Sequence, residues 1–445
     1  MTVRLALDVW LDGFQKPVGQ LEALDNGNMQ FRYASAFLTF GRPVSLSLPL
    51  AEEPIGDART RAFFDNLLPE NDQMQRVIDR EGLDRADIVG ILAHVGADCA
   101  GAISCLPEGA PPVKIPGDLA VDYRPLQHEE IASIVQRLAD RQPLPGDIVD
   151  PSPLAGVQSK IALALLPDGR FGLPADGRKV PTTHILKVPR RRDASEAAQE
   201  EAACQLARAC GFAVSASEHI IIDGVSALLI ERFDRVASNG VVYRLHQEDF
   251  AQAMGLPAGL KYQRYGREGR RFDANRIRTL LDELASPAEA VELFVLTTIF
   301  NLAIGNTDNH AKNHAILYGD DGVPHLAPLY DLLPIRLQHH YTHQLAFNIG
   351  NAAHFDEMNS SDMLAFLAIF GIEGARLKRF IDGPVRSVLE TLETRSEILR
   401  AMRMRPFDDL IGRELGRLSE LMNMGLTLRE RDYVGPPSGG WLPTS

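Results

Sequence analysis

One stretch, Phe300–Asp331, constrains this chain more than any other because it packs polar residues between apolar segments. It reads FNLAIGNTDNHAKNHAILYGDDGVPHLAPLYD. An apolar run with helix-like length, 293–304, leads into a dense polar cluster that ends at Asn313. A short apolar segment, 314–318, is followed by a Gly/Asp turn, a second apolar segment and Asp331. The predicted order is therefore helix, polar loop, strand, turn, strand and a final carboxylate.

The spacing of Asp308, Asn313 and Asp331 is typical of phosphoryl-transfer sites. In such sites one Asp orients the attacking hydroxyl, an Asn binds Mg²⁺, and a second Asp holds the metal against the phosphates. The spacing from Asp308 to Asn313 equals that of the D-x-x-x-x-N catalytic loop of protein kinases. This pattern also occurs by chance, so the following strand, turn and second Asp make it informative.

Two other interpretations fit parts of the same cluster. Asp308 can cap a helix or a loop, because Asn and Asp are common in turns. His310 and His314 are four residues apart, as in H-E-x-x-H zinc sites. However, the general-base Glu is absent and Lys312 would repel a metal, which argues against zinc.

Length and composition indicate a globular protein. The 445 residues suffice for two or three domains, and the hydrophobic content of 45% and charged content of 24% are ordinary. A net charge of −13 argues against a broad nucleic-acid-binding surface, although Arg190–Arg192 form a local basic cluster.

Cysteine usage and the first residues bear on the compartment. The four cysteines form no C-x-x-C pair, which favours a reduced, cytoplasmic environment. The opening MTVRLALDVWLDG does not have the pattern of a signal peptide, and no apolar run has the length of a membrane span. We therefore expect no association with a membrane.

The first hundred residues are expected to be rich in β-structure. Residues 3–9 and 18–21 flank a glycine turn and predict a hairpin. Phe31–Phe40 is predicted to be extended, and Val44–Leu50 alternates with the period of a strand. A proline-rich link, Pro107–Pro116, closes this part.

A glycine-containing loop and a lysine within a strand follow. The loop Ala155–Lys160 (AGVQSK) precedes a predicted strand, and its small residues would let backbone N–H groups approach phosphates. Lys187 lies among apolar residues of the predicted strand Thr183–Pro189, where an unpaired ammonium group is costly. It therefore needs a phosphate or a carboxylate. An ordinary hairpin and a snorkelling lysine remain the structural alternatives.

The next elements complete the predicted nucleotide site. Glu200 and Glu201, on an expected helix, are candidate partners of Lys187, as in the Lys–Glu pair of kinases. The strand that ends at Glu231–Arg235 is where a hinge would offer backbone groups to adenine. The chain after residue 275 is expected to be mostly helical, and the last eleven residues to form a flexible tail.

Several ordered motifs together resemble the HipA family, the serine/threonine-kinase toxins of type II toxin–antitoxin modules. The resemblance covers nearly the whole chain. The matching segments are FFDNLLPEN (Phe63–Asn71), AGVQSK (Ala155–Lys160), THILK (Thr183–Lys187), ERFDR (Glu231–Arg235), RLHQEDF (Arg244–Phe250), NTDNHAKNH (Asn306–His314) and LAPLYD (Leu326–Asp331).

The resemblance implies an α+β fold with a β-rich N-terminal subdomain and a kinase-like, bilobal remainder whose C-terminal lobe is all-helical. The expected divisions are 1–110 for the N-terminal subdomain and 111–245 for the N-lobe with phosphate loop and hinge. The helical C-lobe with the catalytic and metal-binding residues is expected over 246–434, and the tail over 435–445.

The resemblance also implies residue roles. Asp308 is the expected catalytic base, and Asn313 and Asp331 are the expected Mg²⁺ ligands. The expected ATP-binding residues lie in the loop, the lysine strand, the hinge and the catalytic segment: Ala155, Gly156, Val157, Gln158, Ser159, Lys160, Lys187, Glu231, Arg232, Phe233, His310, Ala311, Lys312, Asn313, Tyr330 and Asp331.

Members of the family phosphorylate a translation factor, typically an aminoacyl-tRNA synthetase such as glutamyl-tRNA synthetase, and so arrest growth. They are neutralised by a small helix-turn-helix antitoxin, HipB, with which they repress their own operon. The resemblance therefore implies ATP and Mg²⁺ as cofactors, a HipB-like partner, and contact with operator DNA mainly through that partner.

One position departs from the family pattern. HipA proteins often carry an autophosphorylated serine three residues before the loop glycine, but Pro153 occupies that position here. Ser152, one residue further out, is the remaining candidate for autophosphorylation.

Two alternative functions stay open from the sequence. One is a kinase of related fold that acts on a small molecule. The other is a weakly active scaffold that serves as a co-repressor, although the intact base and metal positions argue against it.

Overall fold

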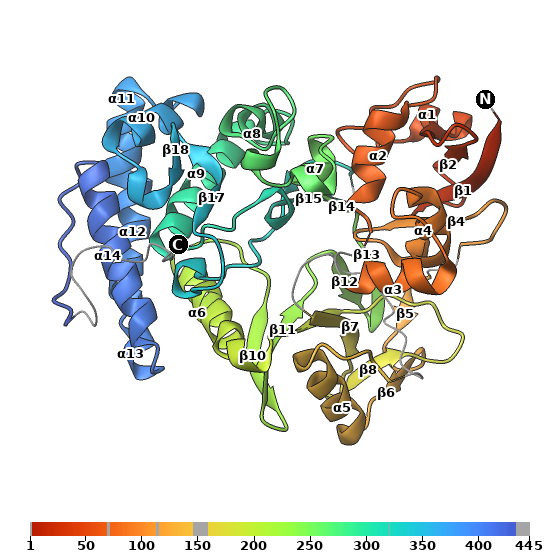
Figure 1. Ribbon diagram of the computed structural model, residues 1–445, viewed down its shortest axis with the longest axis horizontal. Helices are drawn as coiled ribbons and strands as arrows, with labels where there is room; N and C mark the ends of the chain where they lie inside the picture. Colours follow the sequence, from red (N-terminus) through yellow and green to blue (C-terminus); the bar gives the residue numbers. More distant parts are fainter. Residues whose placement is uncertain (1, 69–71, 113–114, 146–158, 320, 433–445) are drawn as a thin grey trace. The chain divides into compact units, whose positions relative to one another are not determined.

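The computed structural model describes residues 2–68, 72–112, 115–145, 159–319 and 321–432 (Figure 1). The chain forms two compact units. The first comprises residues 1–197, 216–259 and 315–327. The second comprises residues 198–215, 260–314 and 328–445.

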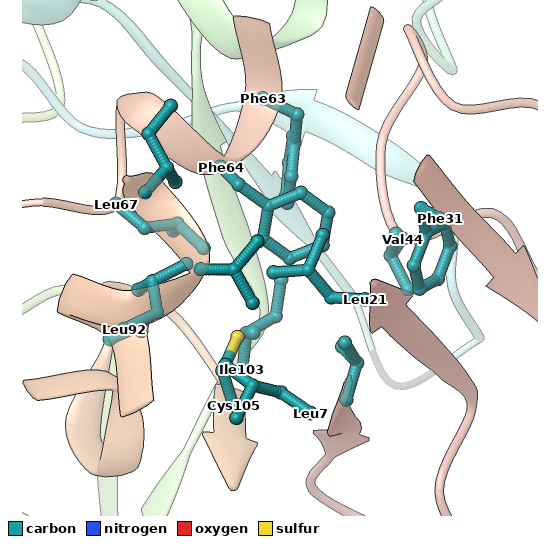
Figure 2. Packing of buried hydrophobic residues seen from close by; sticks show 14 of the residues in the cluster. Leu7, Leu21, Phe31, Val44, Phe63, Phe64, Leu67, Leu92, Ile103 and Cys105 are labelled. Carbon is teal, nitrogen blue, oxygen red and sulfur yellow. The ribbon is translucent and has the colours of Figure 1, made fainter. Parts of the chain in front are cut away.

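The first unit begins with a four-stranded antiparallel sheet. Its order is β3-β2-β1-β4, with β1 Val3–Leu11, β2 Gly19–Leu24, β3 Met29–Tyr33 and β4 Ile103–Pro107. The β1–β2 pair confirms the predicted hairpin. Helices α2 (Asp57–Asp65), α3 (Asp72–Glu81) and α4 (Ile88–Val95) follow. Because side chains alternate across a strand, one face of the sheet places Leu7 and Leu21 in a buried core. Phe63 and Phe64 of α2 and Leu92 of α4 belong to the same core (Figure 2).

Two predicted extended segments are wrong. The second half of Phe31–Phe40 forms helix α1 (Ser35–Phe40), which buries Phe37 against Phe14 and Tyr33. In the described structure Val44–Leu50 forms a turn, closed by the Leu48 N–H that donates to the Ser45 carbonyl at 3.0 Å. The Tyr33 hydroxyl accepts from the Val44 N–H at 3.0 Å and donates to the Leu48 carbonyl at 2.5 Å.

A six-stranded antiparallel sheet forms the second part of the first unit. Its order is β10-β11-β9-β7-β8-β6, and its bounds are β6 Tyr123–Pro125, β7 Ser159–Leu165, β8 Phe171–Pro174, β9 His184–Val188, β10 Ser217–Ile222 and β11 Val225–Glu231. Helix α5 (His128–Ala139) packs on it through Ile134 and Val135, which share a buried cluster with Ile161 and Leu186.

Two small sheets complete the first unit. One has the order β12-β13-β5, with β12 Arg235–Ser238, β13 Val241–Arg244 and β5 Gly117–Asp118. The other has the order β14-β15-β16, with β14 Gln247–Asp249, β15 Ala315–Tyr318 and β16 Pro324–Leu326. The β15–β16 pair is the predicted strand, turn and strand that follow the polar cluster.

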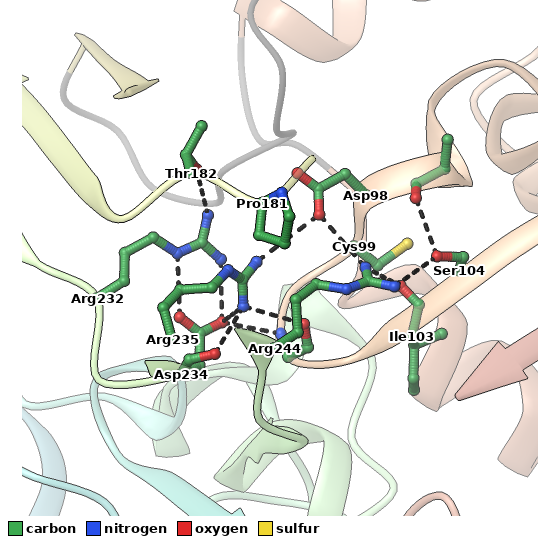
Figure 3. A network of polar contacts seen from close by, with 12 residues as sticks. Asp98, Cys99, Ile103, Ser104, Pro181, Thr182, Arg232, Asp234, Arg235 and Arg244 are labelled. Atoms are coloured by element: carbon green, nitrogen blue, oxygen red, sulfur yellow. Dashed lines mark hydrogen bonds and ion pairs between the residues drawn. The ribbon is translucent and has the colours of Figure 1, made fainter. Parts of the chain in front are cut away.

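A buried charge network lies within the first unit (Figure 3). Asp234 accepts from Arg232 at 2.9 Å and from Arg235 at 2.7 Å. Arg244 pairs with Asp98 at 3.4 Å and with Asp12. Because buried charges need partners, this network ties the residues after β11 to the loop before β4.

The second unit is mostly helical. It contains most of α6 (Ser195–Ala209), then α8 (Ala274–Leu281), α9 (Pro287–Ala303), α10 (Ser360–Ile369), α11 (Gly374–Phe380), α12 (Arg386–Arg395), α13 (Ile398–Ala401) and α14 (Arg405–Leu421), with one short antiparallel pair, β17 (Gln344–Ile349) and β18 (Ala352–His354). Helix α9 is buried over most of its surface and packs against α8, α12 and α14. It ends before Gly305, whose φ of +71° sends the chain sharply into the polar loop.

Candidate active site

The polar loop after α9 is built around the side chain of Asn306. Its amide oxygen accepts from the backbone N–H of Asp308 at 3.1 Å. Its amide nitrogen donates to the Asn301 side chain at 2.9 Å and, over 3.4 Å, to the carbonyl of Asp331. One buried amide therefore links the backbones that carry the two predicted catalytic carboxylates.

Asp308 and Asn313, five positions apart, are joined by a hydrogen bond in the structure. The carbonyl of Asp308 accepts from the His310 N–H at 2.8 Å and from the Asn313 side-chain nitrogen at 2.9 Å. Because that nitrogen is turned toward the backbone, the Asn313 amide oxygen points to the other side, where it can bind a metal. Ala311–Asn313 form a single 3₁₀ turn, η5.

Asp331 has an unusual backbone conformation. Its φ is +58°, in the left-handed region that residues other than glycine rarely adopt. Such conformations cost on the order of 1 kcal/mol or more and are concentrated at functional sites. The neighbouring Tyr330 hydroxyl donates to the Lys312 carbonyl at 2.8 Å, which ties this segment to the loop.

The pKa of Asp308 is set by burial and by several neighbouring groups. Burial raises the pKa of Asp308 to about 6, and the charge of Asp331 contributes to the rise. A hydrogen bond from the Tyr262 hydroxyl, at 2.6 Å from Oδ1, acts in the opposite direction on the pKa, as do the charges of Lys261 and Arg264. The charge of Asp331 thus opposes ionisation of Asp308, which is the effect that a second carboxylate at a cation site would have.

The oxygen atoms in this part of the second unit suit a magnesium ion. Asn313 and Asp331 offer an amide oxygen and a carboxylate, which are ligands that hard divalent cations prefer. The two histidines of the loop are both buried, and burial lowers the pKa of His314 to about 4. His314 packs between the rings of Phe272 and Phe294, so its surroundings are those of a core residue.

Two lysines of the first unit face the same side of the six-stranded sheet. In the antiparallel β7–β9 pair, Lys160 lies directly opposite Lys187. Opposite residues of such a pair project from one face, and like charges placed there repel each other. Lys187 is only 8% exposed. The two lysine side chains therefore project from one face of the sheet.

The predicted hinge residues are largely engaged within the protein. The N–H of Glu231 donates to the Ala216 carbonyl at 2.8 Å, and that of Arg232 donates to the Thr183 carbonyl at 3.0 Å. The Arg232 side chain belongs to the buried charge network (Figure 3). Phe233 lies half-buried in the turn that follows β11.

The remaining predicted residues lie on β7, on α6 or outside the described residues. Ser159 opens β7 opposite Val188. The other loop positions, Ala155, Gly156, Val157 and Gln158, lie outside the described residues, as does Ser152. Glu200 and Glu201 are buried on α6, where Glu201 pairs with Arg208.

Sequence reasoning missed the segment next to Asp308. Tyr262, Lys261 and Arg264 have no fixed spacing from the catalytic loop, and no motif marks them. The one available signal is composition, because residues 261–271 hold five basic residues against one acidic residue in a chain of net charge −13.

Two family models match this chain. A family model for the HipA N-terminal domain matches residues 7–106, and one for the HipA-like C-terminal domain matches residues 152–392. The chain belongs to the HipA family, as its motifs predicted.

Individual relatives extend over most of the chain. The "Putative kinase Y4mE" of Sinorhizobium fredii is 36% identical over 94% of this chain and all of its own length. The "Serine/threonine-protein kinase toxin HipA" of Shewanella oneidensis is 29% identical over 78% of each chain.

A solved structure shows the fold. It is the complex of HipA, HipB and operator DNA from the toxin–antitoxin system of Shewanella oneidensis MR-1. Its matching chain is 24% identical, with a TM-score of 0.78, over 94% of this chain and all of that one. The predicted α+β class with a kinase-like fold is thereby confirmed. Among the described residues, none of the helices has both the length and the apolar character needed to cross a membrane.

Proposed function

We propose that this chain is a serine/threonine-protein kinase that uses ATP and Mg²⁺. The observation that carries the proposal is the joint placement of Asp308, Asn313 and Asp331, with Asn306 bonded to the first and last of them. Membership of the HipA family and the names of two relatives support the same reaction.

Each group in the second unit has a proposed role. Asn313 and Asp331 would hold Mg²⁺, which when bound neutralises charge on the phosphates. Asp308 accepts a hydrogen bond from the serine or threonine hydroxyl and orients its lone pair toward the γ-phosphorus. As the new O–P bond forms and the bond to the bridging oxygen of ADP breaks, the hydroxyl proton passes to Asp308.

The positive groups of the first unit bind the nucleotide in this proposal. Lys187 and Lys160 would contact its phosphates, together with the loop that begins at Ala155. The strand end at Glu231–Phe233 would lie at the adenine. Because the N–H groups of Glu231 and Arg232 already donate within the protein, contacts there would use other backbone groups.

We further propose that the kinase is the toxin of a type II toxin–antitoxin module. Its substrate would be a translation factor such as glutamyl-tRNA synthetase, and phosphorylation would arrest growth. A HipB-like helix-turn-helix antitoxin would neutralise it, and the pair would repress their own operon. The relative named as a toxin and the solved complex of HipA with HipB and operator DNA support this assignment.

The decisive experiment uses γ-³²P-labelled ATP and a lysate of cells from which the antitoxin has been removed. The proposal expects label on a small set of proteins at serine or threonine, with none from an Asp308→Asn variant. Label found only on metabolites would indicate the small-molecule kinase instead. Operator binding without any phosphoryl transfer would indicate the co-repressor scaffold.

A further inference from the structure

Two asparagine side chains make hydrogen bonds to the backbone of Asp308, whereas one tyrosine hydroxyl makes a hydrogen bond to its carboxylate. Asn306 and Asn313 fix the N–H and the carbonyl of this residue. Among the described residues, the hydrogen bond of 2.6 Å from the Tyr262 hydroxyl to Oδ1 is the one bond made to the carboxylate. That bond fixes the rotation of the carboxylate and leaves Oδ2 for a hydroxyl acceptor.

Tyr262 is itself held firmly against the catalytic loop. Its ring meets that of His310 edge to face, with centroids 5.0 Å apart. The carbonyl of the preceding Lys261 accepts from the Ala311 N–H at 3.1 Å. The side chain of Gln263 accepts from the Asn348 N–H at 2.8 Å, which anchors the segment to β17. The segment is therefore part of the site's framework.

Arg264 lies between two aromatic rings of the same segment. Its guanidinium carbon is 3.9 Å from the ring centroid of Tyr262 and 5.0 Å from that of Tyr265. Stacking of this kind fixes the plane of the guanidinium group before any ligand arrives. In the part of the chain that the structure describes, its buried Nη1 atom has no hydrogen-bond partner.

A buried cationic donor without a partner is costly, so it calls for an explanation. The guanidinium group stacks on the ring of Tyr262, whose hydroxyl bonds to Asp308, and its charge acts to lower the pKa of that carboxyl group. In phosphoryl transfer, negative charge is spread over three oxygens of the phosphoryl group. A planar group with several N–H donors is well suited to those oxygens.

We propose that Tyr262 and Arg264 complete the active site: Tyr262 positions the Asp308 carboxylate, and Arg264 donates to the phosphoryl group in transfer. This inference rests on the proposed kinase function and names two residues for the same reaction. Arg264 would be a catalytic residue, since it touches the reacting group, and Tyr262 a positioning residue.

The first test measures binding of a transition-state mimic rather than turnover. Isothermal titration would compare Mg·ADP with Mg·ADP plus aluminium fluoride, which mimics the phosphoryl group in transfer. Arg264→Gln should weaken the aluminium fluoride complex by about 10²-fold, as expected for the loss of one preorganised donor, while Mg·ADP affinity stays within about twofold. Arg267→Gln is the matched control, since Arg267 is an exposed arginine of the same segment.

The second test separates positioning from folding. Tyr262→Phe keeps the ring and its packing but removes the hydroxyl, so kcat should fall about tenfold or more with KM for Mg·ATP nearly unchanged. Thermal unfolding of both variants checks that the fold is retained. Arg264→Lys, which keeps the charge, should recover only part of the analogue affinity.

The outcomes distinguish this inference from the proposed function. If the wild-type protein transfers phosphate and Arg264→Gln binds the analogue as tightly as Arg267→Gln, the inference about Arg264 is wrong. If Tyr262→Phe has the wild-type kcat, the role of Tyr262 is wrong. If the wild-type protein transfers no phosphate to any acceptor, the proposed function itself fails.

Discussion

Lys160 lies directly opposite Lys187 across the β7–β9 pair, so the two side chains project from one face of the sheet. The proposed nucleotide site predicts that removing one of these charges weakens binding of the phosphates without unfolding the protein.

Lys160→Gln provides this test at the less buried of the two positions. Mg·ATP affinity should fall by about tenfold or more, since hydrogen bonds to charged groups contribute roughly 1.5–3 kcal/mol. The melting temperature without nucleotide shows whether the variant keeps its fold. Calorimetry and thermal unfolding measure the two quantities. Unchanged affinity with lowered stability would show that the lysine is structural.

Asp331→Asn separates the charge of this residue from its backbone conformation. Asn adopts the left-handed region about as readily as Asp, so the turn with φ +58° should persist. The loss of one negative charge should weaken Mg²⁺-dependent ATP binding while the fold remains intact. Titration of Mg²⁺ at fixed ATP measures this effect, and an unchanged Mg²⁺ requirement would refute the metal role.

Asn306→Ala should affect both stability and catalysis. It removes the bonds to Asp308 and Asp331 and leaves the buried Asn301 amide without this partner. Buried groups that lose a partner cost about 1–3 kcal/mol. We expect a lower melting temperature and reduced phosphoryl transfer in the same variant. Asn306→Asp keeps the acceptor for the Asp308 N–H but places an oxygen against the Asn301 and Asp331 oxygens, so it should lose both properties as well; wild-type behaviour of this variant would contradict the assigned bonds.

Glu248 should make the stability of the protein depend on pH. It is fully buried and accepts from the Ser45 and Tyr318 hydroxyls, both at 2.5 Å, and from the Leu46 N–H. Burial raises its pKa to about 7 from the usual 4.5, although these hydrogen bonds act against the rise. A raised pKa means that the folded state binds the proton more tightly than the unfolded state.

The stability that this proton contributes is fully present below about pH 4.5 and is lost as pH rises through about 7. The contribution of Glu248 to the free energy of unfolding should therefore decrease between pH 5.5 and pH 8, by an amount on the order of 1–3 kcal/mol. Glu248→Gln should flatten that part of the profile, as measured by urea unfolding at each pH. A parallel profile in the variant would assign the pH dependence to other groups.

The sequence was most informative where chemistry requires fixed spacing. Asp308, Asn313 and Asp331 could be found because a loop and a hairpin set the distances between them along the chain. The hairpin β1–β2 was predictable because its turn contains glycine and its strands alternate.

Other features depend on contacts between segments distant in the chain. Val44–Leu50 alternates like a strand, but it folds into a turn whose backbone bonds to itself and to the distant Tyr33 hydroxyl. Tyr262 reaches Asp308 from 46 positions away in the chain, and no local pattern reports such a contact. The Arg232–Asp234 ion pair is buried, and the sequence alone does not show which charged residues are buried.

The most direct measurement of the central claim is phosphoryl transfer by wild-type protein and by Asp308→Asn at saturating Mg·ATP. Asparagine keeps the size of the side chain but cannot accept the proton, so transfer should fall by about 10²–10⁴-fold while Mg·ATP affinity changes little. An Asp308→Asn protein that transfers phosphate at a rate near that of the wild type would contradict the assignment of Asp308 as the catalytic base.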